Sequence, residues 1–145
     1  MEVLSNSSVL SMEQQSTLAN SVSTKAYGNL VVLGKDNLPK YPHIVTESEI
    51  IIGREKDSDI RIKLASVSRH QCKIFIDEND QVSLVNLSTT NFTLINGEPL
   101  YSTDIAVALK NGDVISVAER SLVFYSSTLN NIFTILYHAL IYIFR

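Results

Sequence analysis

The sequence predicts an all-β protein whose short antiparallel strands form a sandwich. Three observations predict this fold class. The chain has 145 residues and is 45% hydrophobic, which is enough for one core. Apolar and polar residues alternate with period two through its middle, and turn-forming residues separate the alternating segments. The middle has no sustained helical periodicity, and short strands about ten residues apart are typical of a sandwich or barrel.

The alternating segments give the expected strands in chain order. They cover residues 29–33, 49–52, 59–62, 71–76, 81–87, 92–95, 105–109, 113–118 and 121–125. In residues 71–76, Cys72, Ile74 and Ile76 alternate with more polar neighbours such as Gln71. Because side chains of a strand point alternately to its two faces, we expect the first three inward and Gln71 outward.

Turn signals lie between these strands. Asn96-Gly97 and Asn111-Gly112 predict tight hairpins, since both residue types tolerate a positive φ. Residues 78–80 form a further polar turn between two strands. Together these signals favour antiparallel neighbours along most of the chain.

The two ends differ from the middle and predict three parts: a leader at 1–26, a folded domain at 27–126 and a tail at 127–145. The first part is rich in serine and predicts a flexible leader. The tail contains an apolar run at 132–144, shorter than the roughly 20 residues of a membrane-spanning helix. Membrane insertion is therefore not expected, although a marginal tail anchor, an element that covers the domain and a tail from altered processing all stay open.

Composition excludes several function classes. With 12 basic and 15 acidic residues the formal charge is −3, so binding of nucleic acid by bulk electrostatics is not expected. A single cysteine excludes an internal disulfide framework and fits a reducing compartment. The three histidines lack metal-ligand spacing, so no metal and no cofactor are expected.

The residues that could support catalysis have simpler interpretations. His70 and Cys72 share a strand face and could form an imidazole–thiolate pair, but the alternation around Cys72 favours a buried, inert thiol. Asp57 and Asp59 could be read as a carboxylate pair, but they more readily cap or support a loop. We therefore expect no enzyme.

Basic and hydroxyl residues gather at predicted strand ends. Six of the twelve basic residues lie between positions 54 and 73, and Arg54 follows Gly53 directly after an apolar strand. Ser68 and Arg69 precede one strand, and residues 88–91 precede another. Guanidinium groups, hydroxyls and loop amides at one end of a sandwich suit a phosphate dianion. The alternative is that they are ordinary loop residues.

The order of these motifs resembles the forkhead-associated (FHA) domain, a family of phosphothreonine-peptide readers. Its blocks here are Gly53-Arg54, Asp59-Ile60, Val67-Ser68-Arg69, the run at 86–97 and the run at 109–115. The resemblance covers about residues 28–126 and implies a sandwich of about 10–11 antiparallel and mixed strands. Within the family, the run at 58–62 and the 90–91 loop are most similar to the N-terminal FHA domains of proliferation-marker antigens of mitotic chromosomes.

The resemblance implies a role for each matching residue. Arg54 would contact the phosphate and peptide backbone, Ser68 and Thr90 would bond phosphate oxygens, Arg69 would face the same group, and Asn91 would bond the peptide main chain.

Further residues would support the site: Gly53, Gln71, Asn96 and Gly97. Gln71 stands where the family has a histidine that supports the loop, and its amide offers both a donor and an acceptor. Phe92 follows Asn91 where most members have glycine, so a positive φ there would be strained.

The function that this resemblance implies is phosphothreonine-dependent binding of a partner protein. The domain would act as an adaptor or scaffold in kinase-dependent nuclear or cell-cycle assembly, in the nucleus or at the mitotic chromosome surface. Two alternatives stay open: an FHA fold that binds proteins or dimerises without phosphate, and a tail-anchored membrane adaptor.

Overall fold

The computed structural model describes residues 25–46, 48–101, 103–127, 140 and 143–144. Eleven strands form the regular structure between Gly28 and Ser126. They are β1 (Gly28–Leu33), β2 (Pro39–Val45), β3 (Glu49–Gly53), β4 (Ile60–Arg61), β5 (Cys72–Ile76), β6 (Val82–Asn86), β7 (Thr93–Ile95), β8 (Glu98–Leu100), β9 (Ala106–Ala108), β10 (Val114–Val117) and β11 (Arg120–Ser126).

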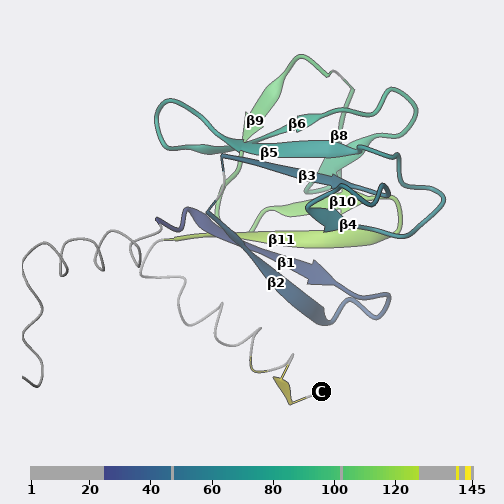
Figure 1. The fold of residues 1–145 in the computed structure, drawn as a ribbon, viewed down its shortest axis with the longest axis horizontal. Coiled ribbons are helices and arrows are strands. Elements are labelled where there is room, and N and C mark those ends of the chain that lie inside the picture. Colours follow the sequence, from purple (N-terminus) through teal and green to yellow (C-terminus); the bar gives the residue numbers. More distant parts are fainter. Residues whose placement is uncertain (1–24, 47, 102, 128–139, 141–142, 145) are drawn as a thin grey trace, which may run out of the picture.

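The strands form two sheets that lie in layers (Figure 1). One sheet has the order β2-β1-β11-β10-β7-β8, and the other has the order β4-β3-β5-β6-β9. The only parallel pair among these strands is β3 with β4, and all the other pairs are antiparallel. The predicted all-β sandwich, with a mixture of antiparallel and parallel pairing, is confirmed.

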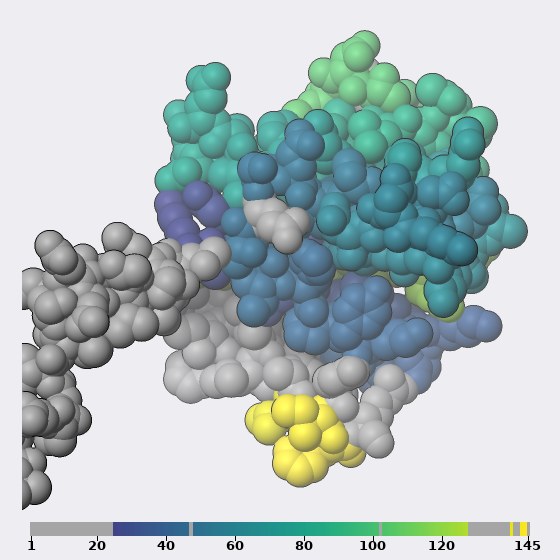
Figure 2. All heavy atoms as spheres, viewed as in Figure 1, coloured from purple at the N-terminus to yellow at the C-terminus, as the bar shows by residue number. Residues whose placement is uncertain are grey.

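Apolar side chains from both sheets share one core. Leu30 and Phe124 from the first sheet join Ile50, Ile74 and Leu84 from the second, each at most 1% exposed. In the space-filling view these layers meet without the open gap that the ribbons suggest (Figure 2). Burial of apolar surface on both inner faces is what holds such a sandwich together.

Two strands were not predicted, and both are edge strands that contain proline. β2 carries Pro39 and Pro42, and β8 carries Pro99. Each strand has only one partner in its sheet, β1 and β7 respectively. Proline cannot donate a ladder hydrogen bond, so it is tolerated at an edge while it hides the strand from a pattern search.

Three local predictions were wrong. The segment 59–62 forms only the two-residue β4, because the Asp59 side chain leaves the strand pattern and accepts a hydrogen bond from Ile51 N at 2.7 Å. Gln71 is fully buried and precedes β5 instead of pointing outward from it. Phe92 precedes β7 instead of beginning it. It is not among the residues with positive φ, so the backbone strain that a positive φ would cause is absent at this position.

The predicted turns differ in conformation. Asn96 and Gly97 both have positive φ, 53° and 83°, as a hairpin with a two-residue turn between β7 and β8 requires. In the Asn111-Gly112 pair only Gly112 has a positive φ, 85°. The first turn is thus the predicted one, and the second uses glycine alone for the left-handed position.

One end of the sandwich gathers the loops that matter for the site. The β3–β4, β4–β5 and β6–β7 connections meet there, at the right-hand end of Figure 1. The antiparallel registers require this, since β3 and β6 end beside the start of β5. Rigid strands thereby fix loops that are far apart in the sequence.

The structure describes too few residues at the two ends of the chain to test the predicted leader and tail. Residues 1–24 of the expected leader and most of the tail at 127–145 lie outside the described residues. Leu140, Ile143 and Phe144 are described and exposed. In the described part of the chain, no helix is long and apolar enough to cross a membrane.

Candidate functional site

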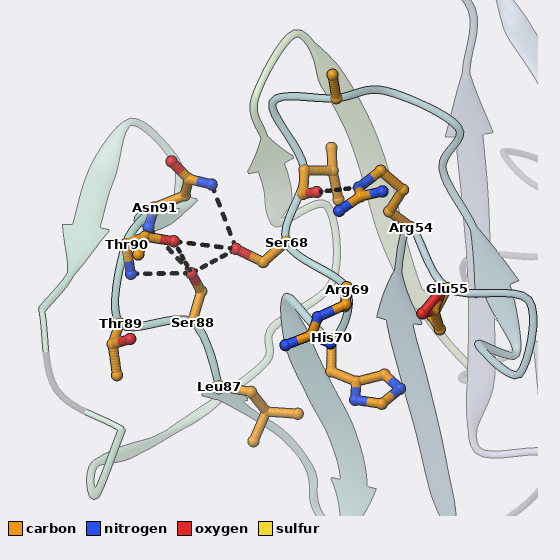
Figure 3. A pocket seen from close by; sticks show the side chains of 12 residues that line it. Arg54, Glu55, Ser68, Arg69, His70, Leu87, Ser88, Thr89, Thr90 and Asn91 are labelled. Carbon is orange, nitrogen blue, oxygen red and sulfur yellow. Dashed lines mark hydrogen bonds between the residues drawn. The ribbon is translucent and has the colours of Figure 1, made fainter.

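A hollow of about 650 Å³ lies between the three loops at this end of the sandwich (Figure 3). Each of the β3–β4, β4–β5 and β6–β7 loops supplies one side of the hollow. The lining residues are Arg54, Glu55, Ala65, Val67, Ser68, Arg69, His70, Leu87, Ser88, Thr89, Thr90 and Asn91.

Gly53 lets the end of β3 lie directly against the β4–β5 loop. A β-carbon on Gly53 would overlap the Arg69 carbonyl oxygen and would lie 3.0 Å from the His70 α-carbon. The next residue, Arg54, donates its backbone N–H to Ser68 O at 3.0 Å and its Nε–H to Val67 O at 3.1 Å. The side chain is thus held by Nε, and the terminal nitrogens of its guanidinium have no partner among the described residues.

Ser88 is the centre of a hydroxyl cluster in the hollow (Figure 3). Its Oγ accepts from Asn91 N at 2.9 Å and from Thr90 N at 3.2 Å, and it lies 2.6 Å from Ser68 Oγ. A hydroxyl has two acceptor positions and one proton. The two backbone bonds fill the acceptor positions of Ser88, so its proton goes to Ser68.

The same reasoning sets the direction of the Ser68 hydroxyl. Ser68 Oγ accepts from Ser88 Oγ and from Asn91 Nδ2, the latter at 3.2 Å. The acceptor that remains for the Ser68 proton within this cluster is Thr90 Oγ1, at 3.4 Å. A hydrogen bond that long is weak. The network therefore presents the Ser68 proton to a stronger acceptor that enters the hollow.

Asn91 and Arg69 complete the polar wall. Asn91 Nδ2 also donates to Ser66 O at 2.9 Å, so the side chain joins the β6–β7 loop to the β4–β5 loop and turns its oxygen away from Ser68 (Figure 3). Arg69 is exposed, and its guanidinium points toward the Leu87–Ser88 side of the hollow. Among the residues that the structure describes, the Arg69 side chain has no hydrogen-bond partner, and only its carbonyl oxygen accepts hydrogen bonds.

Gln71 fixes the two loops from beneath. Its Oε1 accepts from Ser68 N at 3.1 Å, and its Nε2 donates to Asn91 O at 3.3 Å and Thr93 Oγ1 at 3.1 Å. The Thr93 hydroxyl then donates to Asn86 Oδ1 at 2.9 Å. Because all these groups are buried or half-buried, their mutual bonds avoid the cost of unpaired polar atoms.

The structure brings most, but not all, of the predicted site residues together. Arg54, Ser68, Arg69, Thr90 and Asn91 all line the hollow. The supporting residues Gly53 and Gln71 lie directly beneath or behind it.

Asn96 and Gly97, predicted to support the site, lie elsewhere. Asn96 Oδ1 accepts from Val114 N and its Nδ2 donates to Asp113 Oδ1, both at 2.9 Å. These bonds are at the start of β10, whereas β10 reaches the site end at Val117, opposite Thr93. Their turn is therefore at the other end of the sandwich, and neither residue lines the hollow.

The sequence interpretation included Ser88 only as one of the loop residues 88–91, and it assigned no role to Asn86 or Thr93. A signal was present: Asn86 and Thr93 occupy buried positions in strands where the alternating partners are apolar, as in Val82, Leu84 and Ile95. A polar side chain in an inward position needs a partner, and here both partners belong to the floor of one site.

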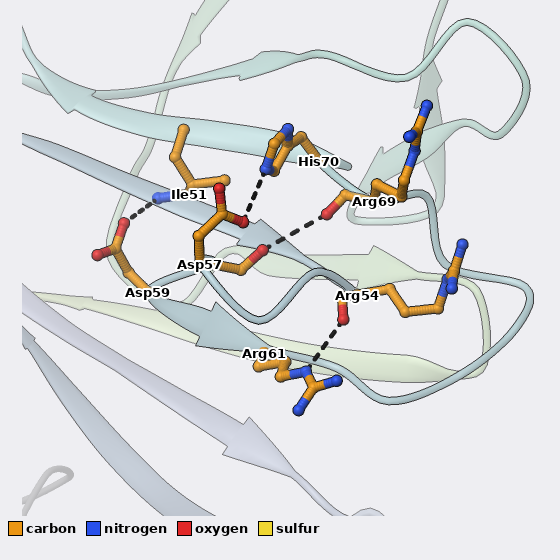
Figure 4. A network of polar contacts seen from close by, with 8 residues as sticks. Ile51, Arg54, Asp57, Asp59, Arg61, Arg69 and His70 are labelled. Carbon is orange, nitrogen blue, oxygen red and sulfur yellow. Dashed lines mark hydrogen bonds and ion pairs between the residues drawn. The ribbon is translucent and has the colours of Figure 1, made fainter.

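Carboxylates hold the outer side of the β3–β4 loop (Figure 4). Asp57 Oδ1 pairs with His70 Nε2 at 3.1 Å, and Asp59 Oδ2 accepts from Ile51 N. Arg61 Nε donates to Arg54 O at 3.1 Å. The supporting role predicted for the aspartates is confirmed for Asp59, which bonds the backbone of a neighbouring strand.

Cys72 is buried and chemically quiet. Burial raises the pKa of its thiol to about 12, which keeps it protonated at neutral pH. The predicted buried, inert thiol is thus confirmed. Among the described residues, no group of three or more His, Cys, Asp or Glu side chains is placed to hold a metal ion.

The hollow has the chemistry of an anion site. Two guanidinium groups, a hydroxyl with a directed proton and loop backbone face one space, and Glu55 is the only carboxylate in the lining. Such groups hold phosphate through charge-assisted hydrogen bonds, and Arg can do so with two parallel donors.

Comparison with known proteins agrees with this geometry. Proliferation marker protein Ki-67 of Homo sapiens is 40% identical over 93 residues, which is 64% of this chain and 3% of that protein. The E3 ubiquitin-protein ligase CHFR of Danio rerio is 33% identical over 104 residues, 71% of this chain and 16% of that protein. The chain therefore spans only a small part of the length of these relatives.

A solved structure shares the fold over nearly its whole length. It comes from a structural and functional analysis of phosphothreonine-dependent FHA domain interactions, and it covers 71% of this chain and 99% of its own. Its TM-score is 0.60 at 25% identity. The family model described as the FHA domain matches residues 50–118, from β3 to the end of β10, and the sandwich of this chain belongs to the FHA-domain family.

Proposed function

We propose that this chain binds phosphothreonine in a partner protein through the hollow between the β3–β4, β4–β5 and β6–β7 loops. One observation carries the proposal: Arg54, Arg69 and the directed hydroxyl of Ser68 face one space in an FHA fold. A phosphate group brings a charge of about −1.5 to −2 and three acceptor oxygens, which match these donors.

Each lining residue has a definite part in the proposed complex. Arg54 donates from its terminal nitrogens to the phosphate while its Nε stays on Val67 O. Ser68 donates its hydroxyl proton, and Thr90 and Arg69 close the remaining sides. Asn91 offers its outward carbonyl oxygen to a main-chain N–H of the peptide.

The setting of this function is proposed from the relatives. Similarity to Ki-67, a proliferation marker protein, supports an adaptor or scaffold role in kinase-dependent nuclear or cell-cycle assembly, with the chain in the nucleus or at the mitotic chromosome surface. The phosphothreonine-dependent interactions of the solved FHA domain support the choice of ligand. In this role the domain binds and does not catalyse.

The phosphate-independent alternative draws on two departures from the family pattern, Gln71 and Phe92. Gln71 makes three hydrogen bonds beneath the site and Phe92 has no positive φ, and both observations favour the phosphate-dependent function. The tail-anchor alternative depends on residues 132–144, most of which lie outside the described residues.

The test is a fluorescence-polarisation titration of the 145-residue chain with degenerate peptide pools. One pool carries phosphothreonine, one the unphosphorylated threonine and one phosphoserine. Removal of a charge-assisted bond costs about 1.5–3 kcal/mol, so Arg54→Ala should weaken phosphothreonine binding roughly 10- to 150-fold.

Lys56→Ala is the matched control, because Lys56 is an exposed cation on the same loop that does not line the hollow. It should change affinity little. Equal binding of phosphorylated and unphosphorylated pools, or equal losses in the two variants, would contradict the proposal.

A further inference from the structure

A second hollow, of about 260 Å³, lies beside the first and is lined by cations. Lys40, Arg61, Lys63 and Arg120 contribute to its wall together with Tyr41, and no carboxylate is among its lining residues. The whole chain carries a net charge of −3, so this concentration of positive charge runs against the average of the molecule.

The fold builds this hollow from both sheets. Lys40 and Tyr41 lie near the start of the edge strand β2, Arg61 ends the edge strand β4, and Arg120 begins β11. Lys63 lies two residues after the end of β4. Burial raises the pKa of the Tyr41 hydroxyl, so the phenol stays protonated at neutral pH and can donate a hydrogen bond.

Within the described part of the chain, none of these four cations forms an ion pair with a carboxylate. The ion pairs found there are those of Lys25, His70 and Lys73. Two acids lie close to this hollow. Glu119 accepts the Ser66 hydroxyl at 2.8 Å, lines a neighbouring hollow and interacts electrostatically with Arg120, and Asp36 lines a further hollow together with Lys40 and Arg120. Like charges that face one space repel one another, and an anion between them relieves that repulsion.

A third, intermediate hollow lies between the second hollow and the first. Ala65 lines the phosphate hollow and also this intermediate hollow, which in turn shares Leu64 and Arg120 with the cationic one. Arg61 also holds the Arg54 carbonyl (Figure 4), so the two sites share a backbone support. A peptide seated in the first hollow can therefore pass over Ala65 and Ser66 toward Arg120, at about 3.3 Å per extended residue.

We propose that the hollow formed by Lys40, Tyr41, Arg61, Lys63 and Arg120 is a second subsite, which binds an anionic side chain of the same phosphothreonine partner. The inference rests on the proposed function, because the phosphothreonine supplies the anchor from which the partner reaches this subsite. Its ligand is a carboxylate or a second phosphate, several residues from the phosphothreonine.

The test compares peptides that differ only in a distal block. Each carries a phosphothreonine within degenerate flanks and, on either the N-terminal or the C-terminal side, a block of four glutamates, two phosphoserines or four glutamines. The full chain is titrated by fluorescence polarisation. On one of the two flanks, the wild type should bind the anionic blocks roughly three- to tenfold more tightly than the glutamine block, and less so at high salt.

Two double variants separate the subsite from net charge. Lys63→Gln with Arg120→Gln should remove the preference for anionic blocks, while a short phosphothreonine peptide without a block binds as it does to the wild type. Lys56→Gln with Lys110→Gln makes the same charge change at exposed lysines outside the hollow and should keep the preference. The glutamate and phosphoserine arms identify which anion the subsite accepts.

Several results would overturn the inference. Equal affinity for glutamate and glutamine blocks, or equal losses in the two double variants, would leave no subsite. Binding of a DNA duplex that depends on Lys63 and Arg120, without discrimination between peptides, would assign the hollow to nucleic acid instead. Failure of the short phosphothreonine peptide to bind the wild type would instead refute the proposed function, and a hexaglutamate peptide that then shifts no amide resonance near Lys63 and Arg120 would refute the subsite as well.

Discussion

Replacement of Gln71 by methionine tests whether the buried polar group beneath the site holds the domain together. Methionine has nearly the same length and volume, so the exchange removes hydrogen bonds without opening a cavity. Three bonds disappear: those to Ser68 N, Asn91 O and Thr93 Oγ1. Gln71 is fully buried, so water cannot replace its amide there.

The magnitude follows from what each former partner has left. Thr93 keeps its bond to Asn86, so its loss is small. Ser68 N loses its hydrogen-bond acceptor, Gln71 Oε1, and an unpaired, half-buried donor costs about 1–3 kcal/mol. With the weaker contact to Asn91 O added, the free energy of unfolding should fall by about 2–4 kcal/mol, which corresponds to a Tm lower by roughly 8–30 °C.

The assay is urea denaturation followed by circular dichroism, with Gln81→Met as the matched control. Gln81 is exposed, at the opposite end of the sandwich, and its amide donates to Val82 O and Leu109 O. The same exchange there should change the free energy of unfolding by less than about 0.5 kcal/mol. If Gln71→Met proved as mild as Gln81→Met, the reasoning about this buried group would be refuted.

Three further predictions concern other buried features of the domain. Gly53→Ala should lower the free energy of unfolding by about 1–3 kcal/mol in urea titration, because its β-carbon would overlap the Arg69 carbonyl; an unchanged midpoint would contradict the close approach. Gln71→His should make stability depend on pH: burial lowers the pKa of the imidazole below its ordinary value of about 6.5, so stability measured at pH 5 and pH 7.5 should fall toward the lower pH, unlike that of the wild type. The Cys72 thiol should resist a thiol-specific disulfide reagent at pH 8 in the native state and react with it in urea; rapid labelling of the native state would contradict its burial. The free energy of unfolding should also fall as the pH rises from 9.0, the ordinary pKa of the thiol, toward its folded-state pKa of about 12.

The sequence was sufficient for the fold wherever alternation and turn chemistry act locally. The core strands and the Asn96-Gly97 hairpin follow from period-two burial and from residues that accept a positive φ. β2 and β8 could not be found in this way, because an edge strand with proline has neither a continuous ladder nor two buried faces. Their existence depends on β1 and β7, which offer an unpaired edge.

The sequence predicts which residues line the candidate site, but not how hydrogen bonds connect them. Motif order brings Arg54, Ser68, Arg69, Thr90 and Asn91 to one set of loops, and they line one hollow. Gln71 can bond both loops from a buried position because the chain turns inward just before β5. Local alternation had assigned the Gln71 side chain to the opposite, outward face.

The placement of Asn96 and Gly97 at the opposite end has the same cause. Proximity in the motif to residues 86–93 suggested support of the site, but a strand of three residues is enough to carry the chain away from it. Which loops share an end of a sandwich is a property of strand direction, and that becomes visible only when the registers are known.

The hydrogen-bond network also determines which groups supply the binding free energy at the proposed site. Ser88 is fixed by two backbone donors, which direct its proton to Ser68 and the Ser68 proton outward, so the hydroxyls need no reorganisation when phosphate arrives. What phosphate gains from them is one directed hydrogen bond, in which only the acceptor is charged. The guanidinium groups of Arg54 and Arg69 add bonds between opposite charges, each roughly twice as strong as a neutral one. The arginines therefore supply most of the binding free energy, while the hydroxyl cluster and Gln71 supply the geometry that lets both arginines act on one anion.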